Sequence, residues 1–328
     1  MPIALILVSV LLQAGTEGFL SGRLDVTASL RFSTMAFLTT AITFTLVTWV
    51  RGRSGAKASA VPAPRGRVRR LLCEMNVAST VTFLGFYLSL AWVPAALAAS
   101  LMAGVGPLAV VVIGAVRGTS PSRPASWVRA VILLAVSLTT ASCIQPGSLR
   151  AAGLLVYAGG ALAVLAGFGT AYLTMVSRSL GALGVDPARV MAHRFHLTYV
   201  LAGVILLLRA GDGVQGLSLG VTGLAAVIGV VVPLYLLQIS IQRCPPIVTM
   251  VLLTALPGLT YVAQVMFGDP FRPLAAALVV VLVALTLCFA LIEGRSRPGS
   301  RPGPRAGQGT RGDHTVRADR TAPADVPS

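Results

Sequence analysis

Long apolar runs alternate with short polar segments along most of this chain. A hydrocarbon core about 30 Å thick is crossed by a helix of about 20 mostly apolar residues. Ten runs of about this length are present, so we predict ten membrane-spanning helices. Their approximate bounds are 2–20, 29–50, 71–92, 95–116, 126–144, 151–176, 190–208, 218–238, 246–267 and 272–292.

Basic residues are distributed unequally between the segments that join these runs. If the N-terminus lies inside, most of the 26 Lys and Arg residues fall on the inside, including Arg178, Arg189 and Arg194. The outside then holds only Arg23, Arg31, Arg150, Arg209 and Arg272. Cytoplasmic loops of membrane proteins carry such an excess of basic residues. We therefore expect a multi-pass protein of the cytoplasmic membrane with both termini in the cytoplasm.

Composition supports a membrane protein and argues against a nucleic-acid-binding one. The apolar fraction is 55%, the charged fraction 11% and the mean hydropathy +0.83, outside the range of soluble globular domains. A net charge of +16 would favour nucleic acid if the basic residues formed one face of a folded domain. They lie instead in loops and in residues 294–328, which are rich in Arg, Pro and Gly and are typical of a disordered tail.

Two landmarks recur in the same order in the two halves of the chain. The first is an Arg-Phe pair near the start of the second and seventh runs, in LRF at 30–32 and HRF at 193–195. The second is a proline corner, VPAA at 93–96 and CPPI at 244–247, followed by Pro107 and Pro257 respectively. Because each half holds five spans, the second half must cross the bilayer in the opposite sense.

The predicted fold class is therefore an all-α integral membrane protein with two inverted five-helix repeats. The first repeat covers residues 1–146 and the second covers 147–293, and the basic cytoplasmic tail covers 294–328. A pseudo-two-fold axis in the membrane plane would place a shared cavity near the midplane, open alternately to either side.

These features resemble the drug/metabolite transporter superfamily, in particular its ten-span EamA-type members. The resemblance covers about residues 2–292 and rests on the Arg-Phe pairs and on the corners AWVPAALAASLMAGVGP and QRCPPIVTMVLLTALPG. It implies that the spans ending at Pro107 and Pro257 line a central cavity. In the first span the chain has Gln13 to Glu17 where the family often has a glycine-tryptophan pattern, so no site is transferred there.

Polar residues inside the predicted spans are the candidates for lining this cavity. An unpaired polar group is costly in lipid, so each must face another helix or a wet cavity. Interhelical hydrogen bonds are the alternative role. The candidates, which share helical faces or sit at the two proline interruptions, are Asn76, Thr80, Tyr87, Pro107, Tyr235, Gln238, Pro257, Tyr261 and Gln264.

Three ionisable residues are candidates for coupling transport to protons. Glu17 lies near the outer end of the first span and could exchange a proton for a cationic substrate. His193 and His196 share one helical face with Tyr199, and histidine changes its charge near neutral pH. Contact with lipid headgroups is the alternative for all three, and for Glu17 so is an ion pair with a neighbouring arginine. For Glu74, which lies beside Arg69 and Arg70, we expect contact with headgroups or an ion pair with a neighbouring arginine.

The predicted function is a secondary carrier that exports a small metabolite or drug-like compound by alternating access. Coupling to protons and facilitated passage both remain open. No GxxxxGK[ST] motif is present, which argues against direct drive by ATP. The low charge within the spans argues against strongly anionic or polycationic substrates.

Other classes of function are less well supported by the sequence. A membrane-embedded enzyme would need an HExxH motif or paired aspartates in a span, and none is present. The four cysteines occur singly, so we predict neither a metal site nor a cofactor. The alternative function is a non-transporting sensor or scaffold that signals through the basic tail. A homodimer is compatible with either function.

Overall fold

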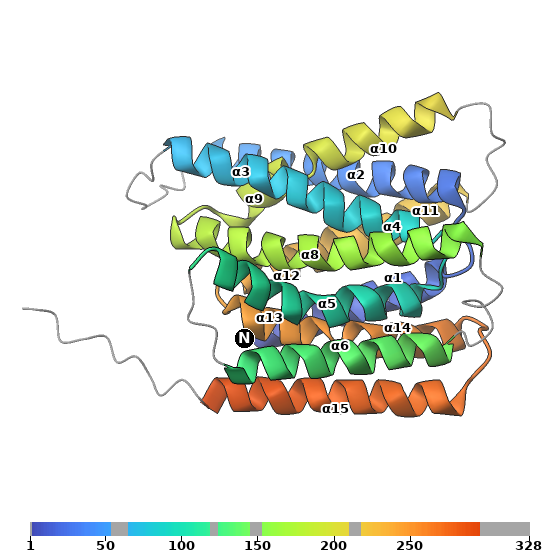
Figure 1. The fold of residues 1–328 in the computed structure, drawn as a ribbon. Helices are drawn as coiled ribbons and strands as arrows, with labels where there is room; N and C mark the ends of the chain where they lie inside the picture. Colours follow the sequence, from blue (N-terminus) through green and yellow to red (C-terminus); the bar gives the residue numbers. More distant parts are fainter. Residues whose placement is uncertain (1, 54–64, 119–123, 145–152, 210–217, 296–328) are drawn as a thin grey trace, which may run out of the picture.

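The protein is a bundle of helices that run roughly side by side (Figure 1). The structure, a computed structural model, describes residues 2–53, 65–118, 124–144, 153–209 and 218–295, and these contain no β-strand. The α-helices are α1 (Pro2–Leu20), α2 (Val26–Arg53), α3 (Arg65–Ser79), α4 (Gly85–Ser89), α5 (Ala95–Val116), α6 (Pro124–Ile144), α8 (Leu154–Ala182), α9 (Pro187–His193), α10 (His196–Leu208), α11 (Leu219–Ala226), α12 (Val232–Ile241), α13 (Pro246–Leu253), α14 (Leu256–Met266) and α15 (Pro273–Arg295). Two π-helical segments complete the order, η1 (Thr80–Leu84) and η2 (Val227–Val231).

Several of these helices have the length and apolarity of membrane spans. Within the described residues eight candidates qualify, namely Pro2–Leu20, Val26–Arg53, Arg65–Ser89, Ala95–Val116, Leu154–Ala182, Pro187–Leu208, Leu219–Ile241 and Val248–Met266. Shorter apolar stretches, Pro124–Thr140 and Pro273–Leu285, lie where the fifth and tenth spans are predicted. The chain is thus an α-helical membrane protein, while the number of ten spans and the inverted repeat stay predictions.

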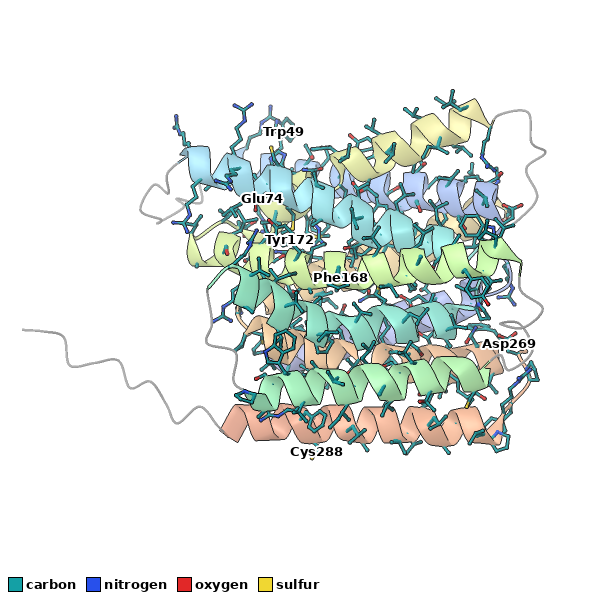
Figure 2. All side chains as sticks on the ribbon, viewed as in Figure 1. Trp49, Glu74, Phe168, Tyr172, Asp269 and Cys288 are labelled. Carbon is teal, nitrogen blue, oxygen red and sulfur yellow. The ribbon has the colours of Figure 1, made fainter. Side chains whose placement is uncertain are left out.

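The outer surface of the bundle is apolar, as contact with lipid requires. Leu46, Leu207 and Val280 are all exposed, and Leu207 keeps 75% of its surface accessible. Trp49 and Phe168 also lie on the outside (Figure 2). A soluble monomer rarely exposes apolar patches of this extent. The surface therefore agrees with the composition in making lipid, rather than water, the surrounding solvent along the helices.

Charged and hydroxyl groups gather at one end of the bundle. Arg70 donates from Nε to Glu74 Oε1 at 3.0 Å, Tyr172 donates its hydroxyl to Glu74 Oε2 at 2.7 Å, and Arg117 donates to Tyr172 Oη at 2.8 Å. The expected pairing of Glu74 with a neighbouring arginine is confirmed. Glu74 and Tyr172 lie at the end opposite Asp269 (Figure 2). The network ties α3 to α8 and α5.

The start of α1 and the end of α15 lie toward the same end of the bundle as this network (Figure 1). That arrangement needs an even number of crossings, which agrees with the predicted topology. The predicted basic tail lies outside the described residues from residue 296 onward. Which membrane holds the protein, and on which side the termini lie, stay predictions.

Two apolar helices change from α-helical to π-helical geometry partway along their length. α3 continues through η1 into α4, and α11 continues through η2 into α12. Each is followed by a proline with an extended backbone, Pro94 (ψ 149°) and Pro245 (ψ 141°), which opens the next helix. π-Helical turns are rare and often accompany functional sites. They occur here in the third and eighth predicted spans, the corresponding positions of the two halves.

The seventh predicted span is broken between α9 and α10. Asp186 caps α9 by accepting a hydrogen bond from the Ala188 amide, and α9 ends at His193. Asn76 on α3 bridges the break: its Nδ2 donates to the His193 carbonyl, and its Oδ1 accepts from the Leu197 amide at 3.2 Å. These bonds satisfy backbone groups that the break releases. Arg194 lies in this break and is buried, whereas His193 and His196 on either side of it are exposed.

The two prolines expected to interrupt spans differ in their effect. Pro107 lies inside α5, which nevertheless continues from Ala95 to Val116. Pro257 lies in the first turn of α14, immediately after the break that separates α13 from α14. Proline lacks an N–H donor and is tolerated in the first turn of a helix, where that donor would be unpaired. Only the second proline therefore coincides with a break in its span.

Candidate functional site

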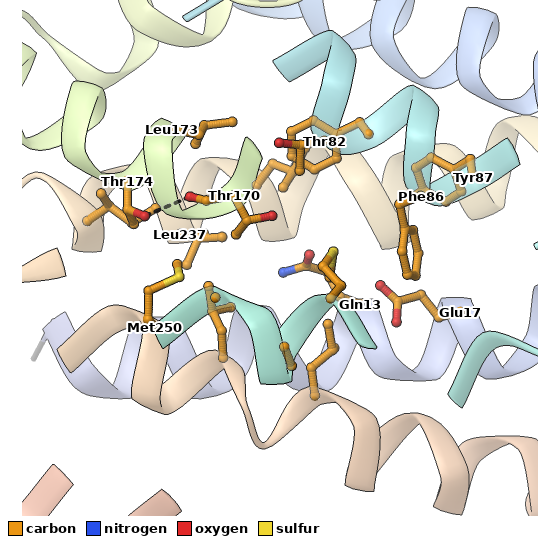
Figure 3. A pocket seen from close by; sticks show the side chains of 18 of the residues that line it. Gln13, Glu17, Thr82, Phe86, Tyr87, Thr170, Leu173, Thr174, Leu237 and Met250 are labelled. Atoms are coloured by element: carbon orange, nitrogen blue, oxygen red, sulfur yellow. Dashed lines mark hydrogen bonds between the residues drawn. The ribbon is translucent and has the colours of Figure 1, made fainter. Parts of the chain in front are cut away.

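A cavity of about 50 Å³ lies inside the bundle (Figure 3). A water needs roughly 10–15 Å³ of such space, so the cavity has room for only a few waters. Its walls come from both halves of the chain. The lining residues are Gln13, Glu17, Thr82, Phe83, Phe86, Tyr87, Met102, Ala103, Gly106, Thr170, Leu173, Thr174, Arg194, Leu234, Leu237, Ile241, Met250, Leu253 and Leu256.

Most of the cavity wall is apolar, with a small number of hydroxyl and amide groups. Thr174 on α8 donates to the Thr170 carbonyl at 2.7 Å, so its hydroxyl proton is engaged by its own helix (Figure 3). Gln13 on α1 donates from Nε2 to Ser9 Oγ at 2.9 Å, which fixes its amide on the cavity side (Figure 3). Apolar pockets with few convergent polar groups are typical of small-molecule sites.

Glu17 forms the acidic part of the lining. It is 5% exposed, and Thr260 on α14 donates its hydroxyl to Glu17 Oε2 at 3.1 Å. Among the described residues no basic side chain lies within 4 Å of this carboxyl group. Gly18 allows the close approach of α1 to α14, because a Cβ there would lie 2.5 Å from Ala263 Cβ. This close packing holds Glu17 at the cavity wall.

Arg194 forms the basic part of the lining, although it lies in the break between α9 and α10. Its side chain is 2% exposed. Nη1 donates to Gln238 Oε1 at 2.8 Å, and Nε donates to Ser79 Oγ at 3.3 Å. The guanidinium carbon lies 4.6 Å from the ring centroid of Phe195 and 5.5 Å from that of Phe83. Cation–π contacts of this kind partly replace lost hydration.

No carboxylate neutralises Arg194 within the part of the chain that the structure describes. The acids with described side chains lie elsewhere: Asp25 caps α2, Glu74 is paired with Arg70, Asp186 lies 3.7 Å from Arg51, and Asp269 is exposed. Glu17 lines the same cavity, yet no ion pair within 4 Å joins it to Arg194. The cavity therefore holds two opposite ionisable groups that do not pair with each other.

Of the predicted cavity residues, one lines this cavity, and three others bond to Arg194 or to the broken span that carries it. Tyr87 lines it and packs against Phe32, with ring centroids 4.9 Å apart. Gln238 lies outside the lining and accepts from Arg194 and, at 3.3 Å, from the Ser177 hydroxyl. Asn76 and Thr80 hold the broken span, Asn76 through the backbone at the break and Thr80 through Thr198, 3.1 Å away.

The other predicted cavity residues lie away from it. Tyr235 packs on Phe44, with ring centroids 4.7 Å apart, because its ring faces α2. Pro107 faces a separate hollow of about 20 Å³ beside α6. Pro257 is buried at the start of α14 but does not line the central cavity. Gly106 lines the central cavity, but its neighbour Pro107 lies on another face of α5. A position next to a lining residue in the sequence therefore does not show that a side chain faces the cavity.

Tyr261 and Gln264 line a larger hollow of about 450 Å³ near Asp269, at the opposite end from Glu74. The Tyr261 hydroxyl donates to the Arg272 carbonyl at 3.0 Å and accepts from the Arg272 amide at 2.8 Å. Gln264 donates to the Ser21 hydroxyl. Both side chains therefore fasten the loop after α14 and the end of α1, and neither reaches the central cavity.

The histidine candidates face outward. His193 and His196 are both exposed, and their ring centroids lie 5.9 Å apart. His196 Nδ1 and Tyr199 Oη are 3.1 Å apart, so the predicted stripe does form one contiguous surface. That surface lies on the outside of the bundle, whereas Arg194, between the two histidines, points inward. Of the three coupling candidates, only Glu17 lines the cavity.

Sequence reasoning missed Arg194 as a site residue and counted it as a charge of a cytoplasmic segment. The structure corrects that placement, because the side chain is buried at the cavity. The available signal was the recurring Arg-Phe pair, which we used only to recognise a repeat. Thr82, Thr170 and Thr174 were also missed, since isolated threonines are common in membrane helices.

Comparisons with known proteins identify the fold but no function. No family model and no curated protein matches this chain. Among the matching solved structures is one described only as a crystal structure of a protein, which covers 91% of this chain and 98% of its own length, with a TM-score of 0.63 and 17% sequence identity. At this identity the likeness shows a shared fold alone. Within the described residues no group of three potential metal ligands is present.

Proposed function

We propose that this protein is a secondary carrier that moves a small molecule across the cytoplasmic membrane by alternating access. The observation that carries the proposal is the cavity between Glu17 and Arg194, built from both halves of an apolar bundle. Unpaired ionisable groups inside a membrane are expensive and usually mark a substrate or ion pathway. A sensor or scaffold has no evident use for two such groups around a shared cavity.

The proposal includes ten spans in two inverted five-helix repeats of the EamA type. Corresponding features of the two halves support it: η1 and η2 interrupt the third and eighth spans, and extended prolines precede α5 and α13. Interrupted helices at equivalent positions are a feature of inverted-repeat transporters, whose sites lie between the repeats. The proposed repeats are residues 1–146 and 147–293, with both termini cytoplasmic.

The size of the cavity supports alternation between conformations. Sites for small organic ligands usually have volumes of about 300–1,000 Å³, several times the volume of about 50 Å³ found here. A substrate therefore requires the helices around the cavity to separate. The breaks at α9–α10 and α13–α14 lie beside the cavity wall, where the helix segments could move relative to one another. Export is the proposed direction, with Glu17 as the group that exchanges a proton.

A bulky side chain in the cavity tests the proposal. Ala103 on α5 lines the cavity, and a phenylalanine there would fill it. Val116 lies on the same helix and is 83% exposed to lipid or headgroups, so Val116→Phe adds a ring without touching the cavity. We would compare small molecules inside and outside host cells that lack the protein or contain the wild type, Ala103→Phe or Val116→Phe at equal membrane levels.

At least one compound should change compartment with the wild type and with Val116→Phe, and not with Ala103→Phe. The same compound is expected to move in liposomes that contain only the purified protein. If no compound moves in cells or liposomes, the carrier proposal is wrong and the result favours the sensor alternative. Deleting residues 296–328 would then be informative, since a sensor that signals through the tail would lose its activity.

A further inference from the structure

The charge state of Arg194 is the starting point. A guanidinium group has no accessible neutral form in proteins, so Arg194 carries a positive charge wherever it lies. Burying such a charge without an opposite charge is unfavourable, because the interaction with neutral dipoles replaces only part of the lost hydration. With 2% of its surface exposed, Arg194 has almost no hydration left.

Every hydrogen bond and ring contact that Arg194 makes within the described structure is with a neutral group. Its hydrogen-bond partners are the amide oxygen of Gln238, the hydroxyl of Ser79 and the thioether of Met191, at 2.8, 3.3 and 3.8 Å. The rings of Phe83 and Phe195 also lie against the guanidinium. These contacts fix the position of the guanidinium while leaving its charge uncompensated. An arginine on the surface is hydrated and needs no such set of protein contacts to hold its guanidinium in place.

Hydrogen-bond donors remain unused around this group. The hydrogen bonds that Arg194 makes within the described chain start from Nε and Nη1, and none of them uses Nη2. The Nε2 amide of Gln238, which is 0% exposed, also has no partner there. Buried donors are nearly always satisfied in proteins, so the unsatisfied amide of Gln238 needs an explanation. A cation with an unused donor group and a neighbouring amide whose donor is unsatisfied together describe a site for an oxygen anion.

We propose that Arg194 recognises a carboxylate group on the transported molecule. The inference rests on the proposed carrier function and names the substrate class of its cavity. The carboxylate would accept from Nη2, and Gln238 would act as a positioning residue that orients the guanidinium. The apolar wall, including Phe83 and Leu237, would receive the remainder of the molecule. This revises the expectation that low charge in the spans disfavours anionic substrates.

Ligand binding to the purified full-length protein in detergent tests this proposal separately from transport. The probes are acetate, pyruvate and benzoate, each compared with its amide, which has nearly the same shape but no charge. Binding would be measured from the ligand-dependent rise in melting temperature. The variants are Arg194→Gln and Arg194→Lys, with Arg189→Gln as the matched control, because Arg189 is an exposed arginine on α9.

At least one carboxylate should bind the wild type about tenfold or more tightly than its amide, the difference expected for one charged hydrogen bond. That preference should disappear in Arg194→Gln, weaken in Arg194→Lys and persist in Arg189→Gln. The wild-type comparison needs no substitution, so it decides the matter even if Arg194→Gln does not fold.

Equal binding of amides and carboxylates, or no binding of any carboxylate, would overturn the proposal. So would an unchanged carboxylate preference in Arg194→Gln. If neutral compounds nevertheless change compartment in the Ala103→Phe comparison, the carrier function stands and only the substrate class is wrong. If no compound moves but carboxylates bind through Arg194, the site is real and the carrier function fails.

Discussion

The two ionisable groups of the cavity differ in how firmly the protein holds them. Arg194 has three hydrogen-bond partners and two aromatic rings, which come from α3, η1, α9, the α9–α10 break and α12. Among the described residues, the carboxyl group of Glu17 has one hydrogen bond, from the Thr260 hydroxyl. Arginine keeps its charge in both conformations of a carrier, whereas a carboxyl group can gain or lose a proton. The difference fits the roles proposed for the two residues, recognition for Arg194 and coupling for Glu17.

The largest effect should come from removing the titratable group and leaving its shape. Glu17→Gln keeps an oxygen that can accept from Thr260 but cannot exchange a proton. If Glu17 couples transport to protons, accumulation driven by a pH gradient should fall to the background of protein-free liposomes. Exchange of substrate without a gradient should continue. The measurement is substrate uptake into liposomes, with and without an imposed pH gradient.

Two results would count against this division of roles. Gradient-driven accumulation that survives in Glu17→Gln would move coupling to another residue. Loss of exchange together with accumulation would mean that Glu17 binds substrate directly. Asp25→Asn is a suitable control, because Asp25 is an exposed acid at the start of α2 and is not part of the cavity.

A smaller effect is expected from disturbing the packing that positions α1. Gly229 in η2 lies so close to α1 that a Cβ there would meet the Thr16 side chain at 2.3 Å. Thr16 precedes Glu17, so Gly229→Ala should push the acidic end of the cavity outward. Overpacking of this kind costs about 1–3 kcal/mol. We expect a lower melting temperature in detergent and weaker gradient-driven uptake.

Gly220 provides the matched control on the same predicted span. A Cβ there would meet no atom within 4 Å. Gly220→Ala should leave uptake unchanged and raise stability slightly, by up to about 1 kcal/mol, because alanine favours helices over glycine. If both alanine variants had equal melting temperatures, close contact between η2 and α1 would not be a feature of the protein in its membrane.

The positions of the helices followed directly from the sequence, because the bilayer requires long apolar runs. The predicted spans 2–20 and 95–116 coincide with α1 and α5, and the ends of the other spans differ from those of the observed helices by up to six residues. The π-helical turns and breaks within the helices could not be predicted in this way. A π-helical turn such as η1 depends on packing between helices: Gly169 on α8 admits Thr82, whose Oγ1 would lie 2.4 Å from an added Cβ.

The site was harder to predict than the fold because a span has many faces and the cavity uses only one. Asn76 and Gln238 were selected for their polarity, and both are buried or partly buried as expected. Their partners decided their roles: Asn76 bridges a broken backbone and Gln238 supports Arg194. Arg194 was not selected because the positive-inside rule assigns a basic residue at the end of a span to the headgroup region. The sequence did not show the break in the span that places this side chain inside the bundle.

The smallest effect should come from the histidines on either side of Arg194. His193 and His196 are exposed on the outside of the bundle, and neither lines the cavity. The only described hydrogen bond of their side chains joins His196 to Tyr199 on the same surface. The double variant His193→Gln and His196→Gln should therefore change uptake less than about twofold. This is roughly the effect expected of surface substitutions, whose free-energy changes stay within about 0.5 kcal/mol. Its dependence on a pH gradient should match the wild type. A loss of gradient dependence in this variant, with Glu17 intact, would transfer the coupling role from the cavity to the outer surface of α9 and α10.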